Sequence, residues 1–319
     1  MTADSFRPNR EPWISPGQFE LHARDMTATF SAEVPLREAQ RALGEVDQWV
    51  PIDGNADTSL GQLVECNSTG PLRLGYGAWR DLLLGLQFEN GRGELITAGG
   101  RVVKNVAGYD LTKFLVGSAG IFGRIEALTV RTWRRPAGVI RAIHAPDVRI
   151  LNRLMPGPLK PQWAMLSRNE LQLGYLGDEP ALQYYRDHVK QSEPREIIEQ
   201  SFADDVAHRA STWRASGETI FRASVPPVRL NELPASLRDA NWIADAAFGI
   251  VLGTAPADRS VVSATFAKLS GTVSFWKGNE TSTPLLDVST NPIERQIIER
   301  LKIAFDPESK LNPLPWSIR

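Results

Sequence analysis

Apolar and polar residues alternate near the start of the chain and then change to a longer period. Between Thr27 and Val34 every second side chain is apolar, which predicts a half-buried strand. From Pro35 to Val46 the apolar residues recur at helical spacing, so we expect an amphipathic helix with Pro35 at its first position. The polar stretch 51–59 predicts a loop.

The pattern then returns to strands. Runs over 85–89 and 94–97 flank a glycine-containing turn at 89–93, which predicts a β-hairpin. A short helix is expected over 110–115 and a strand over 124–133, ended by Arg134-Arg135-Pro136.

The second half has the pattern of a separate α+β unit without an internal sequence repeat. A hairpin is expected around Arg168-Asn169, joining strands over 163–167 and 171–176. Helical spacing follows Asp178 and Pro180. Three further apolar runs predict strands over 220–225, 246–252 and 272–276.

The last helix has clear start signals. Asn291 is the expected N-cap, Pro292 the first helical residue and Glu294 the capping-box partner. The apolar residues expected on its buried face are Ile293, Ile297, Leu301 and Phe305.

A run of glycines interrupts the first half at 99–123. It comprises Gly99, Gly100, Gly108, Gly117, Gly120 and Gly123. Glycine is costly in regular structure, so such a cluster indicates positive φ angles or a close backbone approach. Lys104 and Asn105 add donors, and the combination suits an anionic, planar, phosphate-bearing ligand. The alternative is a tight turn without a ligand, because the run is neither a Walker loop nor a G-x-G-x-x-G after a strand.

Composition excludes several classes of function. The 319 residues carry a net charge of −1, which gives no bulk attraction to nucleic acid. Cys66 is the single cysteine, so an internal disulfide and a cysteine-ligated iron–sulfur cluster are excluded. No apolar run reaches the ~18 residues of a membrane span. We expect no signal peptide, because the N-terminus is polar and contains acidic residues. We also expect no metal site, because the four histidines lack the spacing of metal ligands.

Three blocks of sequence carry a resemblance to a known family. Residues 104–111 read KNVAGYDL and 116–118 read VGS; upstream, 67–85 reads NSTGPLRLGYGAWRDLLLG; near the end, Phe305-Asp306-Pro307 is followed by Asn312-Pro313. These blocks resemble flavin-binding motifs of the vanillyl-alcohol-oxidase/PCMH flavoprotein superfamily. The nearest resemblance is to the FAD-binding subunit of glycolate oxidase, its E subunit.

The resemblance implies an α+β fold with two main domains. An N-terminal extension over 1–24 would precede a PCMH-type FAD-binding domain over 25–136. A cap-like α+β domain over 137–290 would follow, and then a C-terminal helix and tail over 291–319.

The resemblance also implies noncovalent FAD, because no histidine lies in the flavin motifs. The residues that it places at the cofactor are Ser59, Gly61, Asn67, Gly70, Tyr76, Gly77, Asp81, Lys104, Asn105, Gly108, Tyr109, Asp110, Gly117, Gly120, Gly123 and Ile125. Ile125 would face the cofactor through its backbone. Catalytic residues are not identified: a local ion pair or capping role is the stronger interpretation for Arg80, Asp81, Tyr109 and Asp110.

Two departures from the family pattern bear on the cofactor. About 25 residues precede the first strand, without the family's glycine-rich pyrophosphate loop, so the expected FAD domain is truncated at its N-terminus. Gln62 also stands where the family has the second glycine of a pair. Either FAD binds weakly, or a partner chain supplies the missing half, or the flavin has been lost; a mis-assigned start codon would also explain the first departure.

Two functional hypotheses follow from the resemblance. In the first, the chain is the FAD-binding subunit of a 2-hydroxyacid (glycolate) oxidase or dehydrogenase complex and relays electrons to a partner. Its partners would be a larger flavin-containing subunit and an iron–sulfur subunit, in the cytoplasm or held peripherally at the inner membrane. In the second, it is a non-catalytic scaffold that has lost FAD and holds the larger flavin subunit.

Overall fold

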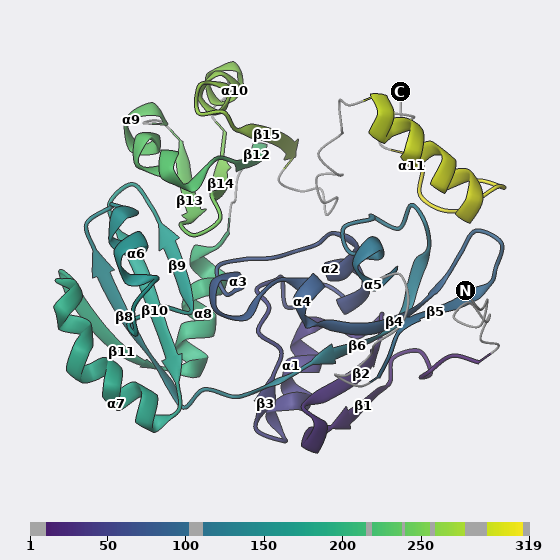
Figure 1. The fold of residues 1–319 in the computed structure, drawn as a ribbon, viewed down its shortest axis with the longest axis horizontal. Coiled ribbons are helices and arrows are strands. Elements are labelled where there is room, and N and C mark those ends of the chain that lie inside the picture. The colour runs from purple at the N-terminus through teal and green to yellow at the C-terminus, as the bar shows by residue number, and fades with distance from the viewer. Residues whose placement is uncertain are drawn as a thin grey trace. The chain divides into compact units, whose positions relative to one another are not determined.

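The computed structural model describes residues 11–101, 111–214, 219–237, 240–255, 259–277 and 292–314 (Figure 1). The chain divides into two compact units. The first unit comprises Met1–Thr69, Gly77–Arg135 and Leu285–Arg319, and the second comprises Gly70–Tyr76 and Pro136–Pro284. Both mix helices with antiparallel sheet, which confirms the α+β class.

A five-stranded antiparallel sheet forms the centre of the first unit, in the order β1-β2-β6-β4-β5. Its strands are β1 Phe19–His22, β2 Thr27–Ser31, β4 Leu83–Glu89, β5 Leu95–Gly99 and β6 Arg124–Arg131. A separate pair joins β3 Gln48–Trp49 to β7 Trp133–Arg134. The predicted hairpin and both predicted strands are confirmed, although the first strand ends at Ser31. β1 was not predicted, and it adds an edge strand from within the expected N-terminal extension.

The helices of this unit lie between the strands in sequence and after them. They are η2 Ala23–Asp25, α1 Leu36–Gly44, α2 Leu60–Glu65, α4 Trp79–Leu82, α5 Leu111–Leu115 and α11 Pro292–Phe305. The predictions of α1, α5 and α11 are confirmed. α2 was missed, because Gly61 directed the interpretation of 58–61 toward a turn; Ser59 accepts a hydrogen bond from the Gln62 N–H (3.3 Å) and caps the helix.

The two faces of the sheet bury different kinds of side chain, apolar on one face and polar on the other. Phe30, Leu86 and Leu128 are fully buried in the apolar core with the helices. On the opposite face the hydroxyls of Thr29 and Thr129 bond each other at 2.9 Å. Gln87, also fully buried there, binds the backbone of residues 11–13, so the start of the described chain covers this polar face.

α11 buries a different face from the predicted one. Ile298, Leu301 and Phe305 contact the core, but Ile293 and Ile297 are 69% and 53% exposed. The prediction was therefore wrong for the first half of the stripe. The reason is the buried side chain of Lys302, which requires backbone acceptors and turns its own face of the helix inward.

The second unit is built on an eight-stranded antiparallel sheet in the order β11-β8-β10-β9-β13-β14-β12-β15. Its strands are β8 Gly138–His144, β9 Trp163–Leu166, β10 Leu171–Gly177, β11 Glu196–Ser201, β12 Thr219–Ser224, β13 Asn241–Asp245, β14 Ile250–Thr254 and β15 Thr272–Lys277. Its helices are α3 Arg73–Tyr76, α6 Arg149–Leu154, α7 Glu179–His188, η3 Val189–Ser192, α8 Phe202–Thr212, η4 Pro227–Glu232, α9 Leu233–Ser236 and α10 Arg259–Lys268.

This sheet contains the same βαββαβ topology twice. The first copy runs β8-α6-β9-β10-α7-β11, and the second runs from β12 through α9, β13, β14 and α10 to β15. The copies pair through β9 and β13. Each copy has the split βαβ arrangement of ferredoxin-like domains. The sequence contains no internal repeat and so gave no sign of this structural duplication.

The predicted elements of this unit are largely confirmed. The 163–176 hairpin, α7, β12 and β15 lie where they were expected. The predicted strand over 246–252 is wrong at its start, since residues 246–249 turn between β13 and β14. Asp245 accepts the N–H groups of Ala247 and Phe248 there, and Gly249 has a φ of +69°.

α7 and α8 lie on opposite faces of the first copy (Figure 1). On the α8 face, buried Asp205 accepts hydrogen bonds from Arg209 Nε (2.8 Å) and Trp163 Nε1 (3.2 Å). α8 therefore brings a buried ion pair to the sheet, and the charges are retained because both are hydrogen-bonded.

Candidate functional site

The described part of the glycine run forms a tight turn against the end of α2. The φ angles of Gly117, Ala119 and Gly120 are +80°, +52° and +70°. The Gly117 N–H donates to the carbonyl of Val64 (3.0 Å), and the Ala119 N–H donates to the carbonyl of Glu65 (2.8 Å). The positive φ angles at 117 and 120 explain why glycine is favoured at these two positions.

Polar groups surround this turn. Asn67 is exposed and has a φ of +46°. It lies beside Gly117, since a Cβ added to Gly117 would lie 3.2 Å from the Cβ of Asn67. Ser118 is buried, and its hydroxyl has no hydrogen-bond partner among the described residues. A buried hydroxyl without a partner is uncommon, so the turn retains hydrogen-bonding capacity.

Glu65 joins the turn to β6 and was not predicted as a site residue. Its Oε1 accepts the N–H of Ile125 at 3.2 Å. Burial raises the pKa of Glu65, while the Ile125 N–H and the guanidinium of Arg124 oppose that shift. The backbone donor of Ile125, which was expected to face the cofactor, is thus bound by a carboxylate of the same chain.

At the start of α2, the N–H groups of residues 60–62 all bond within the protein. The N–H groups of Leu60 and Gly61 donate to Val34 and Ala32 (both 2.9 Å), and the Ser59 hydroxyl caps the helix. A Cβ on Gly61 would lie 2.7 Å from that of Ala32, so close packing of helix on strand accounts for this glycine. The cofactor contacts of Ser59 and Gly61 remain a prediction.

The C-terminal segment holds the same turn from its other side. Lys302 Nζ donates to the carbonyls of Ile121 (3.1 Å) and Asn312 (2.9 Å) and pairs with Asp306. Asn312 Nδ2 donates to the carbonyl of Ala119 at 2.7 Å. The Asp-Pro and Asn-Pro pairs identified this segment in the sequence. Lys302 was missed, although its i,i+4 spacing from Asp306 could have indicated the ion pair.

Other predicted residues have structural roles in the first unit. Asp81 accepts the Ala78 N–H at 2.9 Å, so it caps α4, as the local interpretation of this residue expected. A Cβ on Gly77 would lie 2.7 Å from the Cβ of Asp81, and Gly77 has a φ of +87°. A Cβ on Gly123 would lie 2.3 Å from the Phe88 ring. Their proximity to a cofactor stays a prediction.

Gly70 and Tyr76 belong to the second unit. Burial raises the pKa of Tyr76 far above its usual range, so its phenol stays neutral. Five predicted site residues lie outside the described parts of the chain: Lys104, Asn105, Gly108, Tyr109 and Asp110.

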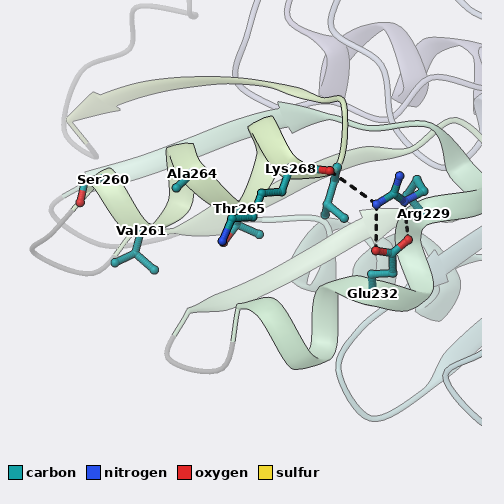
Figure 2. A pocket seen from close by; sticks show the side chains of 8 residues that line it. Arg229, Glu232, Ser260, Val261, Ala264, Thr265 and Lys268 are labelled. Atoms are coloured by element: carbon teal, nitrogen blue, oxygen red, sulfur yellow. Dashed lines mark hydrogen bonds and ion pairs between the residues drawn. The ribbon is translucent and has the colours of Figure 1, made fainter.

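A groove of about 570 Å³ lies between η4 and α10 in the second unit (Figure 2). Arg229 in its wall forms an ion pair with Glu232 and donates to the carbonyl of Lys268 at 3.5 Å. None of the predicted site residues lines this groove. It therefore does not coincide with the candidate site.

No helix among the described residues is long and apolar enough to cross a membrane. Nor do three or more His, Cys, Asp or Glu side chains gather there as metal ligands would.

Comparisons with known proteins place the similarity in part of the chain. No family model matches. The glycolate oxidase subunit GlcE of Escherichia coli is 33% identical over 115 residues, which cover 35% of this chain and 33% of GlcE. GlcD of Bacillus subtilis is 33% identical over 119 residues, 37% of this chain and 25% of GlcD. A mitochondrial D-lactate dehydrogenase (cytochrome) of Arabidopsis thaliana is 29% identical over 130 residues, 40% of this chain and 23% of that enzyme. The matched segments thus span a third or less of these relatives.

The fold comparison extends over most of the chain. An alkyldihydroxyacetonephosphate synthase structure superposes with a TM-score of 0.63 over 90% of this chain and 64% of its own, at 15% identity. At that identity the match shows a common fold alone. The superposition therefore includes most of both compact units.

Proposed function

We propose that this chain belongs to the vanillyl-alcohol-oxidase/PCMH-type flavoprotein family and is the FAD-binding subunit of a 2-hydroxyacid oxidase or dehydrogenase complex. The observation that carries the proposal is the 33% identity to GlcE over 115 residues. The names of GlcD, also a glycolate oxidase subunit, and of the D-lactate dehydrogenases support the hydroxyacid class. Glycolate is the substrate that the resemblance favours.

The glycine turn fits one wall of a noncovalent flavin site. Asn67 is exposed beside Gly117, and the buried Ser118 hydroxyl has capacity for another hydrogen bond. Backbone that follows positive φ angles without a Cβ permits a planar ligand to approach closely. We therefore assign Asn67, Gly117, Ser118 and Gly120 to this wall.

The start of α2 fits the cofactor less well. Its N–H groups at residues 60–62 all have partners within the protein, so they do not form a pyrophosphate cradle in this conformation. Donors for the phosphates must come from elsewhere, and Lys104 and Asn105 are the residues of this chain predicted to supply them. A partner chain could supply others.

Bound FAD would supply the redox chemistry, by accepting electrons released in hydroxyacid oxidation and passing them onward. In that scheme the residues of this chain bind and orient. We propose an iron–sulfur subunit as the electron acceptor and a larger flavin-containing subunit as the substrate-oxidising partner. The assembly would work in the cytoplasm or at the inner membrane through those partners.

A second function is favoured by one specific observation. The Ile125 N–H, expected to face the flavin, is occupied by Glu65. A chain that has lost FAD and kept the fold as a scaffold for the larger subunit would tolerate this arrangement. The two functions differ in flavin content, which is measurable.

The test is the flavin content of the assembled complex. The full chain is co-expressed with the larger flavin subunit and the iron–sulfur subunit, with either wild type or Gly117→Val. We expect one more FAD per complex with wild type than with the variant, and hydroxyacid-driven electron transfer that falls with the loss of that FAD. Equal flavin content and equal activity in two intact complexes would contradict the redox role and favour the scaffold.

A further inference from the structure

The carboxylate of Glu65 occupies a donor inside the predicted flavin site. We propose that Glu65 is a built-in competitor for the cofactor: it holds the Ile125 N–H while the site is empty and must leave when FAD binds. This inference rests on the proposed function and names the residue that sets the strength of cofactor binding.

Two hydrogen bonds and one close approach place Glu65 beside the glycine turn and β6. Its backbone carbonyl accepts the Ala119 N–H at 2.8 Å, which fixes the glycine turn to the end of α2. Its Oε1 accepts the Ile125 N–H at 3.2 Å, and a Cβ added to Gly120 would lie 3.5 Å from its Oε2. The carboxylate therefore lies close to two residues that are predicted to contact the cofactor, Gly120 and Ile125.

The backbone and the side chain of Glu65 have separable roles. Replacing the side chain leaves the carbonyl that binds Ala119 in place. The turn can therefore keep its conformation while the Ile125 donor is released. This separation makes a gain of binding possible without loss of the fold.

The charge of Glu65 should oppose FAD binding, as does its hydrogen bond to the Ile125 N–H. The charged groups that act on the carboxylate are Arg124 and Glu126 of β6: the arginine favours its ionised form and the glutamate opposes it. Arg124 is itself paired with Glu126 (Nε to Oε1, 2.7 Å). An ionised Glu65 would thus repel an anionic ligand with little compensation.

The experiment is FAD titration of the full chain by fluorescence quenching, with wild type, Glu65→Ala and Glu65→Gln. Glu65→Ala removes both the charge and the acceptor, and we expect it to bind FAD about tenfold more tightly or better, since a competing hydrogen bond to a charged group is lost. Glu65→Gln removes the charge but keeps an acceptor, so its affinity should lie between the two. Glu126→Gln is the matched control, because it removes a neighbouring carboxylate without freeing the Ile125 N–H.

Hydrogen–deuterium exchange of the peptide containing Ile125 gives a second measurement, without FAD. Exchange at this amide should be faster in Glu65→Ala than in wild type and unchanged in Glu126→Gln. Wild-type-like FAD affinity in Glu65→Ala, in a chain that does bind FAD, overturns the inference and leaves the proposed function standing. If neither wild type nor Glu65→Ala binds at saturating FAD, the inference fails, and the flavin content of the assembled complex decides the proposed function separately.

Discussion

Lys302 places a charged ammonium in the interior of the first unit, against the glycine turn. Its partner Asp306 is almost fully buried and also accepts the N–H groups of Lys310 (2.8 Å) and Leu311 (2.9 Å). Burial opposes ionisation of Asp306, but Lys302 and these two N–H groups hold its pKa below the usual range. Every charge of the pair is therefore compensated, and the turn is held by the C-terminal segment.

Lys302→Met should be strongly destabilising. It leaves the Asp306 carboxylate buried without its ion-pair partner, and such a loss typically costs about 3–5 kcal/mol. The free energy of unfolding by urea measures it. Lys310→Met is the control, because the Lys310–Glu308 pair is exposed and its loss should change stability by less than about 1 kcal/mol. Similar small effects from both variants would contradict a structural role for Lys302.

Glu65 should make the fold less stable as the pH rises. Its pKa is raised in the folded state from an ordinary value of 4.5, so its contribution is fully present below pH 4.5 and is lost as the pH rises through the folded value. Glu65→Gln has no such titration. We expect the stability of the variant relative to wild type to increase above pH 4.5, measured by urea unfolding across that range. A difference that stays constant with pH would show that Glu65 is not strained by burial.

Among single elements, the strongly periodic segments were predictable, whereas several short helices, α2 among them, were not. Alternation and helical spacing located β2, α1, the β4–β5 hairpin and α7. α2 was missed because its glycine is explained only by tertiary contact with Ala32, which no local pattern reveals. The prediction of the buried face of α11 was wrong for a similar reason, because the buried Lys302 orients that helix. The Glu65–Ile125 bond joins residues 60 positions apart, so sequence spacing gave no signal for it.

Gly61→Ala should test the packing of α2 on β2. The added Cβ would lie 2.7 Å from the Ala32 Cβ and 3.1 Å from its carbonyl oxygen, and neither atom belongs to a flexible side chain. We expect a loss of about 1–3 kcal/mol in unfolding free energy, as for other overpacked sites. Gly157→Ala is the matched control, with an ordinary 3.5 Å contact at the added Cβ. A neutral Gly61→Ala would mean that α2 can move away from the strand.

At the scale of the whole molecule, the sequence led to a flavoprotein-type fold and to a second α+β half, and the fold comparison agrees with both. It did not reveal that the second half repeats one topology, since that repeat is carried by strand order rather than by residues. It also did not reveal α8, because two of the buried residues on its inner face, Asp205 and Arg209, are charged. The domain boundaries stay a prediction, although the first unit also includes residues from the C-terminal segment.

FAD binding at the glycine turn can be measured by an absorbance spectrum of the purified full chain followed by titration with FAD. We expect saturable binding by wild type and its loss in Gly117→Val. Gly93→Val is the control, because Gly93 has a similar φ of +76° but open space around it, so it carries the same backbone strain away from the site. A folded wild-type chain that stays colourless and ignores FAD at high concentration would contradict the claim and leave the scaffold as the function to pursue.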